Sequence, residues 1–339
     1  MRRAMKESAR GTALLVAPLL LLALAASAWA APSELQVVVS FFITVTLVVA
    51  LQMFSGNSGI VSFGHVGFMG VGAYVASLVS IPPAIKSTQV PDLPGFLADV
   101  HVGFVPSLLI AVVATALLAA VVGAVLVRMR ETAMAMATIS VLFVFYNVFE
   151  NWDQVTRGAL GLYGIPRDTT VWSALAVAAL AIALALAFRS SNRGLQLRAS
   201  SADALAAASL GANVPRLRWG AWVLSAAVMG LAGGVWAHFN LAFGPNQFFL
   251  VLTLTLMAMV TVGGLQSVSG VVVGAAIITL VTETMRRVED SVSVPGLTQL
   301  AIALAILVIL MLRPDGVVGP VELHRRVAAL RLRGKGAPR

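Results

Sequence analysis

The sequence predicts an all-α polytopic membrane protein with about ten transmembrane helices, organised as a single transmembrane domain over residues 1–339. Hydrophobic residues make up 59% of the chain and charged residues 11%, and the mean hydropathy is +0.93. Soluble domains carry about 25% charged residues, so a row of soluble domains is excluded. Apolar runs of spanning length recur along the chain, and basic residues gather between alternate runs.

The apolar runs set the expected spans. They cover residues 12–31, 35–54, a third run that ends near Ser80, then 104–127, 133–149, 171–188, 219–237, 248–262, 271–285 and 296–312. The external loops are expected at residues 81–103, 150–170, 238–247 and 286–295. Ala28-Trp29-Ala30 resembles a signal-peptidase site, so a cleaved signal peptide is an alternative to a retained first helix. The length of that run, about 20 residues, favours a retained helix.

The distribution of basic residues predicts the orientation. The net charge is +9, and 18 of the 23 Lys and Arg residues lie in four segments, namely residues 1–11, 128–132, 189–218 and 313–339. The positive-inside rule places these segments, and therefore both termini, in the cytoplasm. Because the basic residues lie between and after the spans, the charge reflects topology, and nucleic acid is not an expected partner. The expected partner is the lipid bilayer.

The segment 189–218 is the longest polar interruption of the apolar sequence. Ser200-Ser201-Ala202-Asp203 matches a capping box with Asp in place of Glu, and strong helix formers follow up to Leu210. Gly211 is a suitable residue to end the helix, and Pro215 prevents simple continuation. The short helix is expected either to lie on anionic headgroups or to dock on another protein and transmit force to the flanking spans.

Two glycine- and serine-rich breaks interrupt the apolar runs, at residues 56–64 and 263–270. They share a Gly-x-x-Ser spacing, which indicates an internal repeat and a transport pathway, and the second break has a re-entrant alternative. Polar groups at membrane depth need protein or water neighbours. The candidate residues of the translocation path are Asn57, Ser58, Ser62, Gly64, His65 and Gly67. For His65, packing against a neighbouring helix backbone is the alternative.

Motifs for catalysis and nucleotide binding are missing from the sequence. It contains no P-loop, no HExxH and no G-x-S-x-G motif, and the absence of cysteine excludes disulfides and thiolate metal sites. The four histidines are far apart in sequence, so no metal site and no cofactor is expected. Glu283, near a span end, is the one candidate for an embedded carboxylate, which argues against a proton-coupled carrier. We expect a pore that another subunit powers, and not an enzyme.

Five motifs, in order, resemble the branched-chain amino-acid ABC transporter permease family, of the LivM type. They lie at residues 56–74, 156–166, 194–214, 263–274 and 313–316, so the resemblance covers nearly the whole chain. It implies a second permease subunit, two cytoplasmic ATPases that bind ATP, and a periplasmic substrate-binding protein. It also implies a bacterial cytoplasmic membrane and branched-chain amino acids as substrates.

The resemblance assigns two further sets of residues. Contact with an ATPase falls on the helix in the segment 189–218, at Asp203, Ala204, Ala207, Ala208 and Gly211. An external gate or binding-protein contact falls on Arg157, Gly158, Gly161, Gly164 and Pro166. The chain departs from the family pattern at Val66, Arg157, Ala159 and Ala204. Since close relatives carry urea or short amides, these departures leave such substrates as alternatives, beside a secondary carrier and a membrane-embedded enzyme.

Overall fold

The structure is a computed structural model that describes residues 2–292, 296–313 and 315–323. The described residues form helices and no strand; one isolated β-bridge joins Leu162 and Phe243. The long helices are α1 (Arg2–Trp29), α2 (Pro32–Ser58), α3 (His65–Ser80), α6 (Phe104–Leu126), α7 (Glu131–Asn151), α9 (Val171–Ser190), α12 (Val214–Asn240), α13 (Leu250–Gly263), α14 (Val268–Val292) and α15 (Leu297–Leu312). The short ones are α4 (Pro83–Gln89), α5 (Gly95–Ala98), η1 (Gly158–Leu160), η2 (Pro245–Phe248), α8 (Asp153–Thr156), α10 (Asn192–Ala202) and α11 (Ala204–Ser209).

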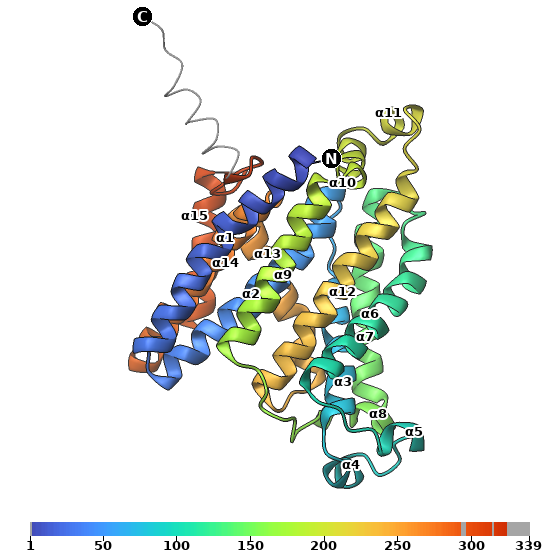
Figure 1. Cartoon of the computed structure of the whole chain (residues 1–339), viewed down its shortest axis with the longest axis vertical. Helices are drawn as coiled ribbons and strands as arrows, with labels where there is room; N and C mark the ends of the chain where they lie inside the picture. The colour runs from blue at the N-terminus through green and yellow to red at the C-terminus, as the bar shows by residue number, and fades with distance from the viewer. Residues whose placement is uncertain (1, 293–295, 314, 324–339) are drawn as a thin grey trace, which may run out of the picture.

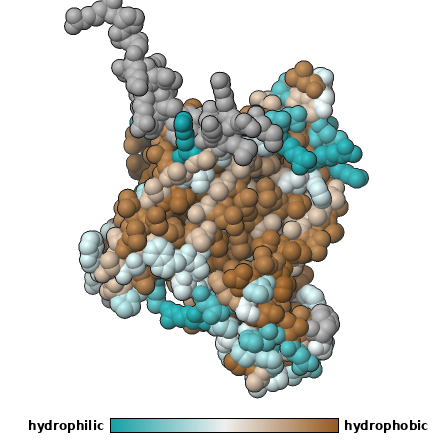
Figure 2. Space-filling model, in the orientation of Figure 1, coloured by the Kyte–Doolittle hydropathy of each residue, from teal (hydrophilic) through white to brown (hydrophobic). Residues whose placement is uncertain are grey.

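The helical lengths confirm a polytopic membrane protein. Among the described residues, 8 helices are long and apolar enough to cross a bilayer, or 9 if α3 and α4, bent by 120°, form one span. α15 contributes a shorter apolar helix, and the count of ten spans stays a prediction. Figure 2 shows apolar residues across the middle of the visible face and hydrophilic residues toward both ends. In Figure 1, α10 and α11 lie at the same end as the N-terminus, and α4, α5 and α8 lie at the other.

Helices α2, α3 and α12 form the centre of the bundle. α12 packs against both α2 and α3, α6 covers α3 and α12, and α9 lies along α2 with α1 outside it. α13, α14 and α15 form a second layer beside α2. From Val39 to its end, α2 is almost wholly buried, because its apolar residues surround the helix and do not form a single stripe.

Glycines allow α3 and α12 to approach each other closely. A Cβ atom added to Gly72 would lie 2.1 Å from the carbonyl oxygen of Gly230, and one on Gly233 would lie 2.0 Å from that of Met69. In lipid, such small residues let helix backbones meet, which favours association through van der Waals packing. Gly72 and Gly233 thus face the partner helix, whereas Gly67 and Gly70 of α3 face the rings of Phe145 and Phe149 in α7.

We predict that Gly233→Ala destabilises the bundle, whereas Gly220→Ala on the same helix does not. The methyl group at position 233 would collide with backbone atoms, at a cost of about 1–3 kcal/mol or more. Position 220 has open space, and alanine there favours the helix by up to about 1 kcal/mol. Thermal unfolding of both variants in detergent is the measurement, and equal shifts of the midpoint would refute the packing argument.

The structure corrects three expected boundaries. Residues 56–58 are helical, because α2 continues to Ser58 and ends at Gly59 with a φ of 74°. Arg286 does not begin an external loop, because α14 runs to Val292; residues 293–295 lie outside the described residues. Glu283 pairs with Arg286 and Arg287 along this helix, so the three side chains offset one another's charge. The polar interruption predicted at residues 189–218 is shorter, residues 191–213, because α9 extends to Ser190 and α12 begins at Val214.

The described part of the C-terminal tail packs into the second break. The backbone N–H of Val317 donates to the carbonyl of Val262 at 2.9 Å, and the N–H of Val318 donates to that of Gly263 at 3.2 Å. The hydroxyl of Ser267 donates to the carbonyl of Gly319 at 2.8 Å. The two bonds from Val317 and Val318 satisfy carbonyls at the C-terminus of α13 that have no partner within the helix. The expected basic tail is thus structural up to Leu323; residues 324–339 lie outside the described part of the chain.

Glu322 in this tail caps the N-terminus of α14. Its carboxylate accepts from the backbone N–H of Val268 at 2.8 Å and of Ser269 at 3.1 Å. The same carboxylate pairs with Nε of Arg189, at the end of α9, at 3.0 Å. Only 4% of the Glu322 side chain and 10% of the Arg189 side chain are exposed. A buried carboxylate is stable here because a guanidinium and a helix N-terminus both favour its negative charge.

We predict that Glu322→Ala lowers the free energy of unfolding by about 3–5 kcal/mol, because the substitution leaves the buried Arg189 without this carboxylate. Glu283→Ala is the matched control: its arginine partners are 60% and 63% exposed. Removing exposed ion pairs of that kind costs at most about 1 kcal/mol. Thermal unfolding compares the two, and a similar loss in both variants would contradict the structural role of Glu322.

Candidate functional site

The first break, residues 59–64, brings the predicted path residues together around His65. His65 begins α3, and its Nδ1 lies 2.7 Å from the hydroxyl of Ser62. The rings of Phe54, Trp222 and Phe68 surround the imidazole, with centroid distances of 5.5, 4.7 and 6.3 Å. His65 is fully buried, so it packs inside this subunit. That environment favours the packing alternative for His65.

The other predicted path residues are equally enclosed. Asn57 and Ser58 are buried at the end of α2, where Asn57 Nδ2 donates to the carbonyl of Met53 at 2.9 Å. Helix α7 covers the break: a Cβ on Gly64 would lie 2.9 Å from the carbonyl oxygen of Thr138, and one on Gly67 would lie 2.1 Å from the Phe145 ring. α7 thus separates the glycines of this set from the surface of the subunit. The role of all six residues in the translocation path stays a prediction.

The second break lies against the last turns of α2, which lead into the first break. A Cβ atom on Gly56, in the last turns of α2, would lie 2.2 Å from the carbonyl oxygen of Leu265 in the second break. The sequence predicted two related interruptions by their Gly-x-x-Ser spacing. The contact of Gly56 with Leu265 explains why a glycine is needed at position 56, because a side chain there would displace the second break.

The predicted cytoplasmic segment contains two helices instead of one. α10 begins after Ser191, whose hydroxyl accepts from the N–H of Gly194 at 3.1 Å. Ser200 lies within α10 and is buried, so the capping box starting at Ser200 is wrong. Asp203 caps α11 instead: its Oδ1 accepts from the N–H groups of Leu205 and Ala206, both at 2.9 Å.

The surface of α11 differs from the predicted contact set. Ala207 is buried and Ala204 is half-buried, whereas Ala208 is exposed. Gly211 has a φ of 88°, and its N–H donates to the carbonyl of Ala208, as expected for the residue after a helix. The largest apolar side chains exposed on this helix and its C-cap are two leucines that sequence reasoning did not single out. Leu205 is 80% exposed and Leu210 is 90% exposed.

Helix α10 touches the first break. A Cβ atom on Gly59 would lie 3.1 Å from Cβ of Ser201, at the end of α10. α10 also packs against α2 and α12. The segment predicted to be cytoplasmic therefore lies directly against the interruption between α2 and α3.

The predicted external gate folds as a tight loop held by its neighbours. Gly161, with a φ of 69°, packs so closely that a Cβ atom would lie 2.0 Å from the carbonyl oxygen of Phe243. Leu162 and Phe243 exchange two backbone hydrogen bonds of 2.9 Å. His238 Nδ1 lies 3.1 Å from the carbonyl oxygen of Pro166, and a Cβ on Gly164 would meet the side chain of Ile85 in α4 at 3.1 Å.

A second segment, α4 and α5, supports the same loop. The side-chain amide of Gln89 donates to the carbonyl of Tyr163 at 2.7 Å and accepts from its N–H at 3.1 Å. The Lys86 ammonium donates to the backbone carbonyls of Leu97, at 3.1 Å, and Val100. Burial lowers the pKa of Lys86, and the Asp99 carboxylate opposes this shift. The loop is therefore fixed in shape before any partner binds.

Arg157 contributes to the shape of this loop. Its φ is 62°, a left-handed conformation that glycine adopts more easily, and Gly158 next to it also has a positive φ. The guanidinium donates to the carbonyl of Gly161 at 3.3 Å and lies 4.9 Å from the centre of the Tyr163 ring. Contact of Arg157 with a binding protein stays a prediction.

We predict that Arg157→Gly is tolerated better than Arg157→Ala. Both variants lose the two guanidinium contacts, but only alanine retains the cost of the left-handed backbone, about 1–2 kcal/mol. Hydrogen exchange of the amides of residues 158–164 measures the difference, and it should be faster in the alanine variant. Equal exchange in the two variants would contradict a strained backbone at this position.

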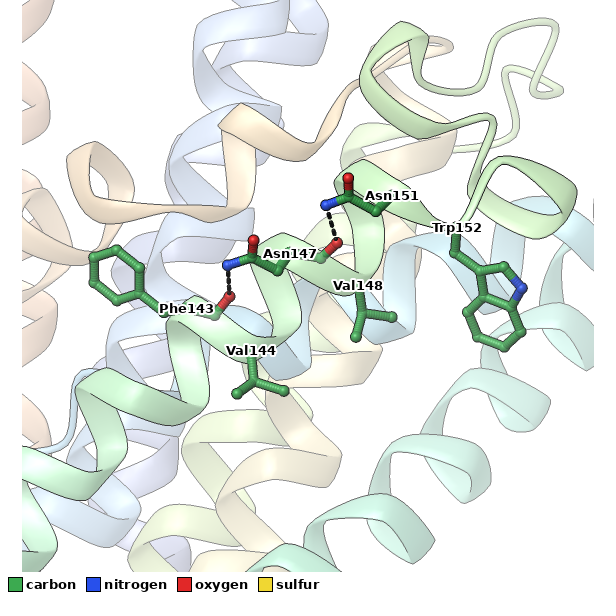
Figure 3. A pocket seen from close by; sticks show the side chains of 6 residues that line it. All are labelled: Phe143, Val144, Asn147, Val148, Asn151 and Trp152. Carbon is green, nitrogen blue, oxygen red and sulfur yellow. Dashed lines mark hydrogen bonds between the residues drawn. The ribbon is translucent and has the colours of Figure 1, made fainter.

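Sequence reasoning missed the outward face of α7, which lines a groove of about 740 Å³ (Figure 3). Its lining residues are Phe143, Val144, Asn147, Val148, Asn151 and Trp152. The available signal was a pair of asparagines four residues apart, at the end of an otherwise apolar run. Four residues is one helical turn, so both amides lie on the same face.

The long apolar helices, the paired breaks and the loops held at opposite ends define a polytopic membrane transport protein. Residues 34–312 match the model of the family described as the permease component of the branched-chain amino acid transport system, and the chain belongs to this family. No curated protein and no solved structure matched the chain. Members of this family are transport permeases that work with other subunits.

Proposed function

We propose that the chain is the permease subunit of an ABC importer that carries branched-chain amino acids across the bacterial cytoplasmic membrane. Its ATPase partners, in this proposal, dock on α11 at the cytoplasmic end. The observation that carries the proposal is the pair of exposed leucines, Leu205 and Leu210, on a capped helix at the end predicted to be cytoplasmic. An exposed apolar pair of this kind is suited to burial in another protein. The sequence itself contains no P-loop that would hydrolyse ATP.

Two contacts link the proposed docking helix to the membrane-embedded breaks. The first is the contact of Ser201 in α10 with Gly59 in the first break. The second runs through Arg189, which ends α9 just before α10 and pairs with Glu322 at the second break. Nη2 of Arg198 in α10 also donates to the backbone carbonyl of Arg189 at 3.3 Å. Movement of α10 and α11 by an ATPase would therefore reach both breaks through direct contacts.

The remaining subunits follow from the same proposal. A second permease subunit would pair with this one, two ATPases would bind at the cytoplasmic end, and a periplasmic binding protein would dock on the loop of residues 157–166. The fixed shape of that loop, held by Gln89 and His238, supports docking of a rigid partner. Both termini would be cytoplasmic.

We predict that Leu205→Arg uncouples ATP hydrolysis from leucine uptake while the protein still inserts and folds. The substitution places a charge in the proposed interface, but Leu205 is 80% exposed in this chain, so the fold should tolerate it. Leu205→Met is the matched control, because it keeps an apolar side chain of similar volume. ATPase stimulation and ATP-driven uptake of radiolabelled leucine in proteoliposomes are the two measurements.

The same assay separates the proposal from its alternatives. ATP-dependent leucine uptake by the unmodified complex supports it, whereas uptake driven by a proton gradient without ATP would indicate a secondary carrier. ATP-driven uptake of urea but not of leucine would replace the substrate and retain the class. Normal coupling in the Leu205→Arg variant would remove α11 as the docking element.

A further inference from the structure

We propose that the outward face of α7 is this subunit's wall of the substrate path, where Asn147 and Asn151 bind the ammonium group of an amino acid with an apolar side chain. The inference rests on the proposed function and names a binding surface for its substrate. It differs from the sequence-based prediction, which placed the path at residues 57–67. Gly64 and Gly67 among those residues lie under the inner face of α7, and the groove lies on its outer face.

Polar side chains form a stripe along the exposed side of α7. Ser140, Asn147 and Asn151 are all exposed, and their spacing of seven and four residues places them on one face of the helix. Residue 147 lies inside the predicted span of residues 133–149. An amide exposed to hydrocarbon is costly, and polar residues within spans usually face protein or a water-filled path. This face of α7 therefore borders something other than lipid.

The two asparagines present acceptor atoms to the groove. Nδ2 of Asn147 donates to the carbonyl of Phe143 at 2.8 Å, and Nδ2 of Asn151 donates to that of Asn147 at 2.8 Å. Because the amide nitrogens bond back to their own helix, the Oδ1 atoms point away from it (Figure 3). A carbonyl oxygen accepts hydrogen bonds only, so these atoms suit an ammonium group, which donates three and accepts none.

The rest of the groove is apolar. Phe143, Val144, Val148 and Trp152 line it on either side of the asparagines. Its volume is about 740 Å³, it is open on the side away from the helix, and its lining residues all belong to α7 and its C-cap. A surface with two acceptors among aliphatic and aromatic side chains matches an ammonium group beside a branched aliphatic chain.

A carboxylate strengthens the preference for a positive group. Glu150 precedes Asn151, and its Oε1 accepts from the hydroxyl of Tyr146 at 3.0 Å. The same hydroxyl lies 3.0 Å from Oδ1 of Asn246, and the Tyr146 ring stacks on Phe249 at 4.2 Å. The carboxylate is thus held at the outer end of α7, where its charge attracts an arriving ammonium group.

Cysteine accessibility tests the surface directly, since the chain has no cysteine. We would place Asn147→Cys, Asn151→Cys and Val121→Cys one at a time in the assembled transporter in proteoliposomes. Val121, on α6, is 69% exposed and serves as the control for a lipid-facing position. We expect a water-soluble thiol reagent to modify positions 147 and 151 but not 121.

Ligand protection tests the chemistry of binding. Leucine at about ten times its half-saturating concentration should slow modification of both cysteines about tenfold, because occupied sites are shielded. 3-Methylbutylamine, which keeps the ammonium and the aliphatic chain, should also protect, and 4-methylpentanoate, which lacks the ammonium, should not. Protection by the carboxylate compound alone would overturn the assignment of the ammonium group.

Uptake measured in parallel separates this inference from the proposed function. If ATP drives leucine uptake but positions 147 and 151 react as slowly as position 121, α7 faces lipid or a tightly packed subunit, and the inference is wrong. If leucine protects both cysteines but its uptake does not require ATP, the binding surface is supported and the importer proposal fails. Asn147→Leu should raise the KM for leucine about tenfold, the change expected when one charge-assisted bond of about 1.4 kcal/mol is lost.

Discussion

The ion pair and helix cap formed by the buried carboxylate of Glu322 are the interactions on which the end of the structure that holds α10 and the C-terminal tail depends. This carboxylate caps α14, pairs with Arg189 at the end of α9, and holds the tail against the second break. A buried ion pair adds little net stability compared with apolar packing, but it specifies one arrangement, because any other leaves a buried charge without its partner. Three segments far apart in sequence therefore share one geometry. The second break is closed by this arrangement and not by its own glycines alone.

The same interaction ties the second break to the segment between α9 and α12. Arg189 is the last basic residue of α9, and α10 begins three residues later. The first break is tied to the same segment by a different means, the close approach of Gly59 and Ser201. One link is electrostatic and the other is steric, and both meet in α10. A rigid α10 would transmit a displacement to both breaks together, which fits the contact of the second break, at Leu265, with Gly56 in the last turns of α2.

The sequence was informative wherever the physical cause was local. Apolar runs predicted the helices, and Gly211 predicted the end of α11. The predicted capping box began at Ser200, three residues before the actual N-cap, Asp203. Ser200 lies within α10, where its hydroxyl donates to the carbonyl of Leu197. Glu322 could not be predicted, because its partners lie more than 50 residues away and nothing local marks it as buried. The burial of Ala207 likewise depends on how α11 packs.

Helix α7 joins the two halves of the proposed mechanism. Its inner face packs on the first break through Thr138 and Phe145, and its outer face carries Asn147 and Asn151. Its N-terminal end is held by the ion pair of Glu131 with Arg218, near the start of α12. Packed cores move as units, since voids and overlaps both cost free energy. A shift of the first break would therefore turn or displace α7 as a whole. In the proposed function this motion changes the orientation of the asparagine acceptors, so that hydrolysis at the cytoplasmic end alters substrate affinity near the external end without a continuous chain of polar groups between them.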